Sequence, residues 1–370
     1  MEQSLDFSHE ERERGRAYHR PLYLAAAVDL ALGAAVLALL AWGAPGRWLY
    51  GAVDELGWAG AAAGFSAVVV AVSAAVRLPL AWWRGFLRER RWGFSTQRAS
   101  GWLADAAKGL AVSVVLTAAL WTGVVGLARA WPGWWAVPAA AALAAAMLVL
   151  SFVAPVVLEP LFNRFRPLAD ERLAAELRAL AAEAGVPVRD VLVVDASRRS
   201  TKTNAYVSGL GRTRRVVVYD TLLDAADERE LKLVVAHELG HRREGHVARF
   251  TALGMLGVAA SVALLWAVLG TRVGSPRELP AALLLLLGLQ VAGMPPGAAL
   301  SRRWERVADR CSLELTGDAD AFERAHRSLA RRNLADLAPP RLVYLFLFSH
   351  PTAPERLALA REWARAPTRT

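Results

Sequence analysis

Six long apolar stretches constrain the fold of this chain more than any other feature of its sequence. A helix that crosses a hydrocarbon core about 30 Å thick needs about 20 predominantly apolar residues. Six stretches meet this length, and the sequence therefore predicts a polytopic α-helical membrane protein with about six transmembrane helices. The stretches are Leu22–Trp42, Trp58–Val76, Gly109–Ala128, Trp134–Leu158, Phe250–Thr271 and Leu279–Ser301.

Asp29 is the one charged residue within these stretches. A carboxylate inside the bilayer is costly, and such residues usually face a cavity or the interior of a helix bundle. A charged side chain can instead extend along an apolar surface towards the polar interface. The sequence does not choose between these two environments for Asp29.

The charges outside the apolar stretches predict the orientation of the chain. The net charge is +10. Arginines gather at 12–20, before the first stretch, and at 77–98, between the second and third, whereas the alternate loops contain few. Because cytoplasmic loops are enriched in Lys and Arg, we expect a multi-pass cell-membrane protein with both termini and residues 159–249 in the cytoplasm. This distribution accounts for the basic charge without a nucleic-acid partner.

The segment His237-Glu238-Leu239-Gly240-His241 has the most specific chemical meaning in the sequence. Two histidines four residues apart lie on one face of a helix, where both can bind the same zinc ion. Glu238 then reaches a water molecule on that ion and can act as the general base. The motif predicts a zinc metallopeptidase in which His237 and His241 are ligands and one Zn²⁺ per chain is the cofactor.

A catalytic zinc site of this kind needs a third protein ligand and leaves the fourth position open to water. Glu305 is the candidate, because the two apolar stretches between His241 and Glu305 form a hairpin that returns the chain to the same side of the membrane. Asp309 lies one helical turn further on, where it can orient a ligand histidine. The alternative is a solvated pair of acids among the neighbouring arginines.

The metal motif lies in the one large polar insert between apolar stretches. This insert contains a helical pattern at Glu171–Ala184 and β-rich runs at Val191–Val194, Asn204–Val207 and Val216–Tyr219, the last two joined closely enough for a hairpin. Leu231–His246 is predicted as a helix that leads into the fifth stretch. We expect four units: a membrane region of four transmembrane helices (1–158), a cytoplasmic α+β zincin-like metalloprotease domain (159–249), a transmembrane hairpin (250–301) and a cytoplasmic helical region that completes the zinc site (302–370).

Other candidate residues carry weaker signals. His350 and Arg356 can each donate a hydrogen bond to an oxyanion that forms during catalysis, although a histidine before a proline is more often a helix cap or a surface residue. His246 follows His241 by five residues and, on a continuous helix, points to a different face. Structural or solvated roles are expected for the histidines that belong to no motif, which are His9, His19 and His326.

Six segments occur in an order that is typical of one enzyme family. They are RLPLAWWRGFLRERRWGFSTQ at 77–97, PLFNRFRPL at 160–168, TNAYVSGLGRTRRVVVYDTLL at 203–223, HELGH at 237–241, SRRWERVAD at 301–309 and SHPTAPERL at 349–357. In this respect the sequence resembles the membrane-embedded CAAX prenyl endopeptidases, the type I CAAX proteases. The resemblance implies a zinc metalloendopeptidase in which a ring of membrane helices surrounds a water-filled chamber.

The resemblance also implies roles for individual residues. His237, His241 and Glu305 correspond to the zinc ligands and Glu238 to the general base. His350 and Arg356 correspond to residues that line the catalytic site. Asn204 and Ala205 fall in the edge strand that binds substrate by main-chain pairing, as in β-strand addition.

The expected partners are the lipid bilayer and a peptide or protein substrate, either lipidated or associated with the membrane. Two alternatives remain at this point. One is a quality-control metalloprotease like the bacterial heat-shock enzyme, which usually has two spans before its zinc helix where this chain has four predicted. The other is a non-catalytic scaffold or transporter that retains a zincin shell, although no motif residue is replaced here.

Overall fold

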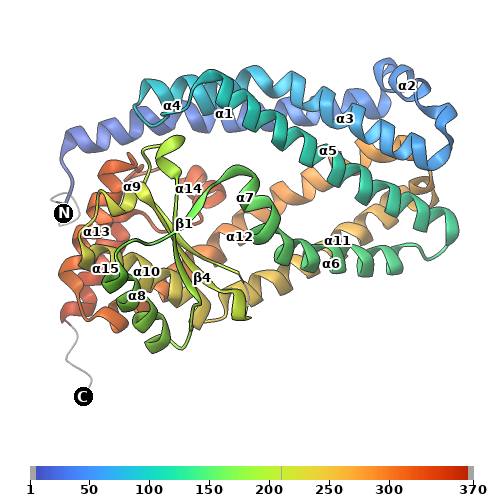
Figure 1. Cartoon of the computed structure of the whole chain (residues 1–370). Helices are drawn as coiled ribbons and strands as arrows, with labels where there is room; N and C mark the ends of the chain where they lie inside the picture. Colours follow the sequence, from blue (N-terminus) through green and yellow to red (C-terminus); the bar gives the residue numbers. More distant parts are fainter. Residues whose placement is uncertain (1–5, 210, 366–370) are drawn as a thin grey trace.

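Six helices in the computed structural model are long and apolar enough to cross a membrane. The structure describes residues 6–209 and 211–365. Each apolar stretch predicted from the sequence coincides with one of these helices, which run side by side along the long axis of Figure 1. Their helical cores are α1 (His9–Trp42), α3 (Gly57–Trp82), α5 (Ala99–Ala130), α6 (Ala136–Val153), α11 (His246–Leu269) and α12 (Leu279–Thr316).

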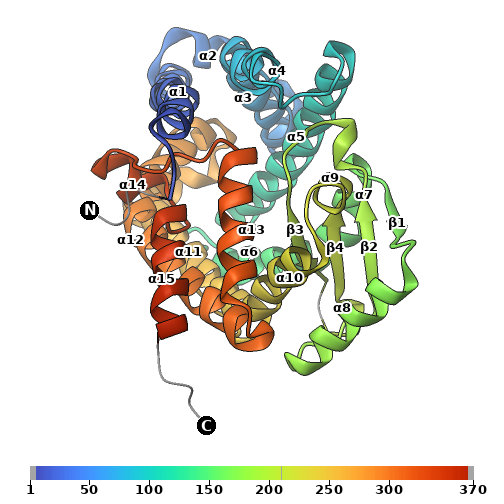
Figure 2. The same ribbon diagram turned by 90° about the vertical axis from the view of Figure 1, so that its left-hand side faces the viewer.

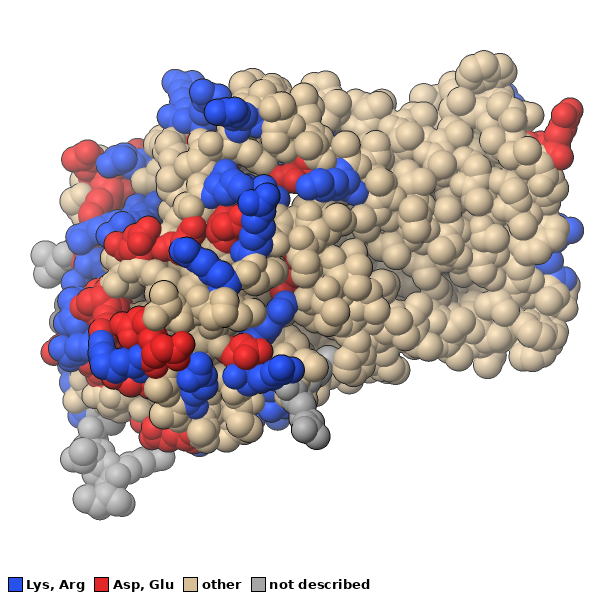
Figure 3. Space-filling model, in the orientation of Figure 1, with Lys and Arg blue, Asp and Glu red and all other residues tan. Residues whose placement is uncertain are grey.

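The charges are distributed unevenly along these helices. In the face shown in Figure 3, Lys, Arg, Asp and Glu gather at the end that carries the β-sheet, and a few lie at the opposite end. The broad band between them is uncharged. Large apolar side chains such as Leu24, Val115 and Leu256 are about two-thirds exposed in this part of the molecule. An exposed apolar band bounded by charges is what a bilayer covers.

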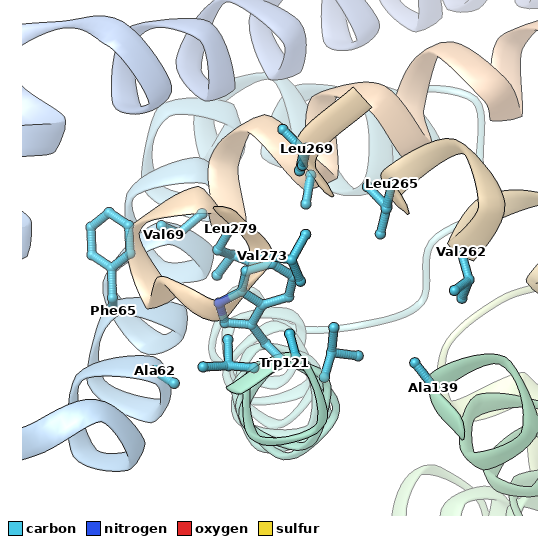
Figure 4. Packing of buried hydrophobic residues seen from close by; sticks show 14 of the residues in the cluster. Ala62, Phe65, Val69, Trp121, Ala139, Val262, Leu265, Leu269, Val273 and Leu279 are labelled. Atoms are coloured by element: carbon cyan, nitrogen blue, oxygen red, sulfur yellow. The ribbon is translucent and has the colours of Figure 1, made fainter. Parts of the chain in front are cut away.

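A buried apolar cluster joins the membrane helices at the end away from the sheet. Figure 4 shows Phe65 and Val69 of α3, Trp121 of α5 and Leu265 of α11 in one buried cluster there. The indole Nε1 of Trp121 donates a hydrogen bond of 3.1 Å to the carbonyl oxygen of Pro276, so the buried ring leaves no donor without a partner. This cluster ties the helical hairpin α11–α12 to α3 and α5.

Asp29 of α1 lies against α3, where it meets Arg77. The Arg77 Nε donates to Asp29 Oδ1 at 2.8 Å, and Nη2 donates to Oδ2 at 2.5 Å. A bidentate arginine–carboxylate pair satisfies both charges where water is scarce. Of the two environments open for Asp29, the structure thus has it facing a neighbouring helix with an ion-pair partner.

A four-stranded sheet lies between α6 and α10 in the sequence. The strand order is β1-β2-β4-β3, with β1 (Phe165–Pro167), β2 (Asp190–Val194), β3 (Ala205–Ser208) and β4 (Arg215–Tyr219). The β3–β4 pair is the predicted hairpin, and β2 runs parallel to β4. Three strands coincide with the predicted runs, whereas β1 was not predicted because its three residues include a proline and carry no alternation. Figure 2 shows β3 at the side of the sheet nearest α13.

The edge strand β3 is fixed to the membrane helices from both ends. Glu159, at the end of the fourth membrane helix, accepts hydrogen bonds from Ser208 Oγ at 3.0 Å and from Arg215 Nη2 at 3.1 Å. Lys202, just before the strand, pairs with Glu89 at 2.7 Å. The sheet is therefore held in a defined position above the membrane part.

The helix that carries the metal motif ends earlier than predicted. It is α10 (Glu228–Arg243), and α11 begins at His246 after a break at Gly245, whose φ is +69°. A positive φ of this kind favours glycine and ends a helix. The prediction of one helix continuing through His246 was therefore wrong.

The remaining elements complete the two ends of the molecule. α12 continues without a break from the membrane to Thr316, so residues 302–316 belong to the sixth membrane helix. The other helices are α2 (Ala44–Gly51), α4 (Arg88–Arg91), α7 (Glu159–Phe162), α8 (Glu171–Glu183), α9 (Asp220–Leu223), α13 (Ala319–Arg332), α14 (Arg341–Leu347) and α15 (Ala353–Arg365).

Candidate metal centre and active site

Two helices from distant parts of the chain bring the candidate ligands together. α10 packs along α12, so that His237 and His241 of α10 face Glu305 of α12. Gly240 lies at the contact, where a Cβ atom would come within 3.2 Å of the Ala308 carbonyl oxygen. The small residue within the motif thus allows the two helices to approach closely.

The three candidate ligand residues form a compact group, the donor triangle, in which each carboxylate oxygen of Glu305 faces a different histidine. Nε2 of His237 lies 3.2 Å from Nε2 of His241. Glu305 is 3.3 Å from His237 Nε2 through Oε2 and 3.2 Å from His241 Nε2 through Oε1. Ligands bound at about 2.0–2.1 Å in a tetrahedron are about 3.3 Å apart. Two imidazole nitrogens and a carboxylate at this spacing fit a zinc ion.

The other ring nitrogen of each histidine has a neighbour that can fix its orientation. Nδ1 of His237 is 2.9 Å from Asp309 Oδ1, close enough for a charge interaction although not in line for a hydrogen bond. Nδ1 of His241 is 3.1 Å from Nδ1 of His246. A proton on each Nδ1 would leave both Nε2 lone pairs free for a metal ion.

The carboxylates around His237 change its proton affinity. Burial lowers the pKa of His237, but Asp309 and Glu305 outweigh this effect and raise the pKa to about 10. A histidine must be neutral to bind zinc, so metal binding at His237 is coupled to proton release. Burial raises the pKa of Glu238, which makes its carboxylate a better proton acceptor.

Arg356 and His350 approach Glu305 from the C-terminal region. Arg356 Nη2 donates to Glu305 Oε2 at 2.7 Å, and Nη1 donates to Asp309 Oδ1 at 2.8 Å. Nε2 of His350 is 3.3 Å from Glu305 Oε1, and 62% of the His350 side chain is exposed. Arg356 is buried behind the carboxylates, whereas His350 is accessible at the donor triangle.

Two further histidines lie near the site. From the sequence, His246 was predicted to point to a different helix face from His241, which was wrong, and His326 to have a structural or solvated role. His246 lies against His241 because the break at Gly245 turns it back, and its ring stacks on Trp304 with centroids 5.1 Å apart. His326 is buried, with Nε2 3.9 Å from Asp309 Oδ1. Burial and the charge of Arg356 lower the pKa of His326 to about 3, so its ring is neutral. Gly245, directly before His246, was the one signal in the sequence that could have predicted the break in the helix. The sequence around His326 contained no signal that it lies near the site.

Asn204 and Ala205 lie at the edge of the sheet next to the helix that carries the metal motif. β3 contacts α10, which carries the metal motif. The carbonyl oxygen of Asn204 accepts a hydrogen bond of 3.0 Å from the Tyr219 N–H, so the main chain of Asn204 is directed towards β4. Ala205 is next along the strand, and its main-chain groups point away from β4.

Family models match almost the whole chain. The model for peptidase family M48 matches residues 167–364, and a model described as the N-terminal region of CAAX prenyl proteases, with five membrane helices, matches residues 6–164. The chain belongs to peptidase family M48. Within residues 6–164, the described part of this M48 chain has four candidate membrane helices.

Individual relatives agree with this family. An uncharacterised metalloprotease of Bacillus subtilis, YhfN, is 31% identical over 82% of this chain and 74% of its own length. A CAAX prenyl protease 1 homologue of Arabidopsis thaliana is 30% identical over 79% of this chain and 72% of its own. The fold resembles the crystal structure of Ste24p from S. mikatae, with a TM-score of 0.82, 23% sequence identity and coverage of 96% and 90% of the two chains.

These similarities confirm several predictions made from the sequence. The M48 protein is a multi-pass membrane metalloendopeptidase of the CAAX prenyl protease type, and its family implies a metal cofactor and a peptide or protein substrate. The match of the N-terminal membrane region to CAAX prenyl proteases favours this type over the bacterial heat-shock enzyme.

Proposed function

We propose that this M48 enzyme cleaves peptide bonds with a zinc ion held by His237, His241 and Glu305. The observation that carries the proposal is the donor triangle on two packed helices, in which the N–N and N–O distances between the three residues are 3.2–3.3 Å. Three protein ligands leave one position open, as a catalytic zinc site requires. Asp309 and Arg356 position Glu305 and His237 in this proposal.

The side chains around this triangle supply the proton transfers. When bound, zinc polarises a water molecule and lowers its pKa towards neutrality. Glu238, whose pKa is raised by burial, accepts a proton from the attacking water and delivers it to the leaving amine. His350 is accessible at the triangle and donates to the carbonyl oxygen as negative charge develops there. Arg356 already donates to two carboxylates, which favours a positioning role over direct contact with the oxyanion.

The substrate binds as an extended strand along β3. Ala205 begins β3 next to α10 and offers main-chain groups on the free edge, and Asn204 precedes it. Main-chain pairing gives affinity with little dependence on side chains. Relatives are named CAAX prenyl proteases, and a lipid-modified peptide at the membrane surface is therefore the substrate that we propose.

The catalytic end of the molecule faces the cytoplasm in this proposal. The arginines at 12–20 and 77–98 lie on the side of the sheet, whereas Arg47, Arg129 and Arg272 lie at the opposite end of the membrane helices. The positive-inside rule then puts the metalloprotease domain at 159–249 and the C-terminal region at 302–370 in the cytoplasm, with four membrane helices before the domain and a helical hairpin at 250–301.

Metal removal and restoration test this function. Purified protein in detergent is treated with a chelator and incubated with a prenylated peptide and its unprenylated counterpart, and the products are identified by mass spectrometry. We expect cleavage to stop without metal, to return with Zn²⁺, and to be faster with the prenylated peptide. Cleavage that survives complete metal removal contradicts the zinc mechanism, whereas equal rates for the two peptides contradict only the proposed substrate.

A further inference from the structure

We propose that Asn333 determines substrate specificity by closing one end of the edge strand, so that substrate pairs with the main chain of Ala205 and not with that of Thr203. This inference rests on the proposed peptidase function and concerns the register in which the peptide binds. It follows from the directions of the main-chain groups of β3 and from the side chains that occupy them.

The outward-facing groups of β3 are identified by its pairing with β4. The Tyr219 N–H donates to the carbonyl oxygen of Asn204, and the register opposes Ala205 to Val218. In an antiparallel pair, alternate residues direct both main-chain groups to the partner strand. The main-chain groups of Thr203, Ala205 and Val207 therefore face the free edge, beside α10.

Asn333 occupies the free edge at Thr203. Its Oδ1 accepts a hydrogen bond from the Thr203 N–H at 3.4 Å, and its Nδ2 donates to the Thr203 carbonyl oxygen at 3.4 Å. One side-chain amide thus takes the donor and the acceptor that a residue of an added strand would take. The main chain of Thr203 therefore has no free group to offer on this edge.

Arg242 occupies the other end of the same edge. Its Nη2 donates to the Val207 carbonyl oxygen at 2.6 Å. Among the described residues, the main-chain groups left without a partner on this edge are the N–H and C=O of Ala205 and the N–H of Val207. A peptide that binds along this edge can therefore make a complete residue pair with Ala205 alone.

A strained turn holds Asn333 in this position. The next residue, Leu334, has a φ of +48°, which is rare for a residue with a side chain. The turn packs closely against α1. Tyr23 of α1 donates a hydrogen bond of 2.7 Å to Asp336. Gly15 of α1 lies so close to the Ala335 carbonyl oxygen that a Cβ atom there would overlap it. Strained backbone persists where the surroundings impose it, and such positions cluster at binding sites.

In the described part of the chain, the free main-chain groups on this edge are therefore confined to Ala205 and the N–H of Val207. This short set fixes which residue of the substrate lies opposite Ala205. A substrate that extends towards Thr203 cannot pair there, because the N–H and C=O of Thr203 are already bonded to Asn333. The substrate main chain must therefore diverge from β3 at this point. Asn333 is then a specificity-determining residue, because it controls register without contacting the donor triangle.

N-methylation of the substrate shows which of its main-chain N–H groups pair with β3. A peptide that the wild-type enzyme cleaves is synthesised in a series, each member methylated at one main-chain nitrogen, and kcat/KM is compared with that of the unmethylated peptide. In the wild type we expect one strongly sensitive position, the residue whose N–H donates to Ala205. The residue opposite Thr203, two positions away, should tolerate methylation because no acceptor is available to it.

Removal of the Asn333 side chain should make a second substrate position sensitive to N-methylation. In Asn333→Ala, the Thr203 carbonyl becomes available, and methylation of the residue opposite it should lower kcat/KM about fivefold, the effect of one hydrogen bond. Asn333→Asp keeps the acceptor for the Thr203 N–H but loses the donor to its carbonyl, and should reveal the same position in a less perturbed protein. Rates are normalised to the unmethylated peptide for each variant, so a general loss of folded enzyme cancels.

The outcome separates this inference from the peptidase function. Two sensitive positions already in the wild type, or an unchanged pattern in both variants, would overturn the role of Asn333 while the enzyme remained a zinc peptidase. Failure of the wild type to cleave any metal-loaded peptide would overturn the function itself.

Discussion

Arg356 donates a hydrogen bond of 2.7 Å from Nη2 to Oε2 of Glu305, although the two residues are 51 positions apart in the sequence. The second guanidinium nitrogen bonds to Asp309 at 2.8 Å, one helical turn further along α12. One buried cation is therefore shared by two buried carboxylates at the candidate metal centre. Charges that are buried together stabilise a fold only when each has its partner.

Replacement of Arg356 is expected to impair the metal centre as well as turnover. Arg356→Ala leaves Glu305 and Asp309 without their shared partner, and we expect kcat and metal affinity each to fall about 10–100-fold. Arg356→Lys keeps the charge and should retain more metal. Metal content by mass spectrometry and kcat on a model peptide measure both effects.

Arg361→Ala provides the matched control for this arginine. Arg361 is on the same helix, but it pairs with Asp6 and Glu323 away from the metal centre. Its loss should leave metal content and kcat near wild type. Equal effects of the two alanine variants would show that Arg356 acts through the stability of α15 and not through Glu305.

His246 is expected to support His241 as a ligand. With its Nδ1 at 3.1 Å, His246 can accept the proton that His241 must carry on Nδ1 when its Nε2 binds zinc. His246→Ala should therefore weaken zinc affinity about 10–100-fold, as measured by competition with a chromogenic chelator. An affinity equal to that of the wild type would return His246 to a packing role against Trp304.

Patterns that depend on local periodicity could be predicted from the sequence. The six membrane helices follow from the length of the apolar stretches, and the helical spacing of His237 and His241 follows from their separation of four. The proximity of Glu305 followed from the return of a helical hairpin. In each case one physical rule connects the residues, so tertiary contacts were not needed.

Features that depend on a break or on a tertiary contact could not be predicted in this way. The contact of His246 with His241 depends on the left-handed residue Gly245, which interrupts an otherwise continuous helical pattern. The pairing of Arg356 with Glu305 and the approach of Asn333 to Thr203 join segments with no common periodicity. These contacts require the packing of α13 and α15 against the rest of the chain.

A proline at Ala205 tests the binding edge. The N–H of Ala205 points away from β4, so Ala205→Pro removes an outward-facing donor and leaves the β3–β4 hydrogen bonds in place. We expect KM to rise at least fivefold, with zinc content unchanged. Normal KM in a folded proline variant would mean that the substrate binds elsewhere.

The orientation in the membrane is testable with reporter fusions. A reporter inserted at Ser197, in the sheet region, should give a cytoplasmic signal, as should a fusion at Thr370, which lies outside the described residues. A reporter in the loop at Gly133, at the opposite end of the membrane helices, should give an extracytoplasmic signal. A reversed pattern at Ser197 and Gly133 would place the metal centre on the other side of the membrane.

The most direct test of the account compares zinc content with peptide cleavage in Glu238→Gln. The substitution preserves the size of the side chain and removes the base, while the three ligands His237, His241 and Glu305 remain. We predict one zinc per chain, as in the wild type, and kcat lowered at least 100-fold, because the proton of the attacking water has no acceptor. Substantial cleavage by zinc-loaded Glu238→Gln, after contaminating proteases have been excluded, would contradict the account.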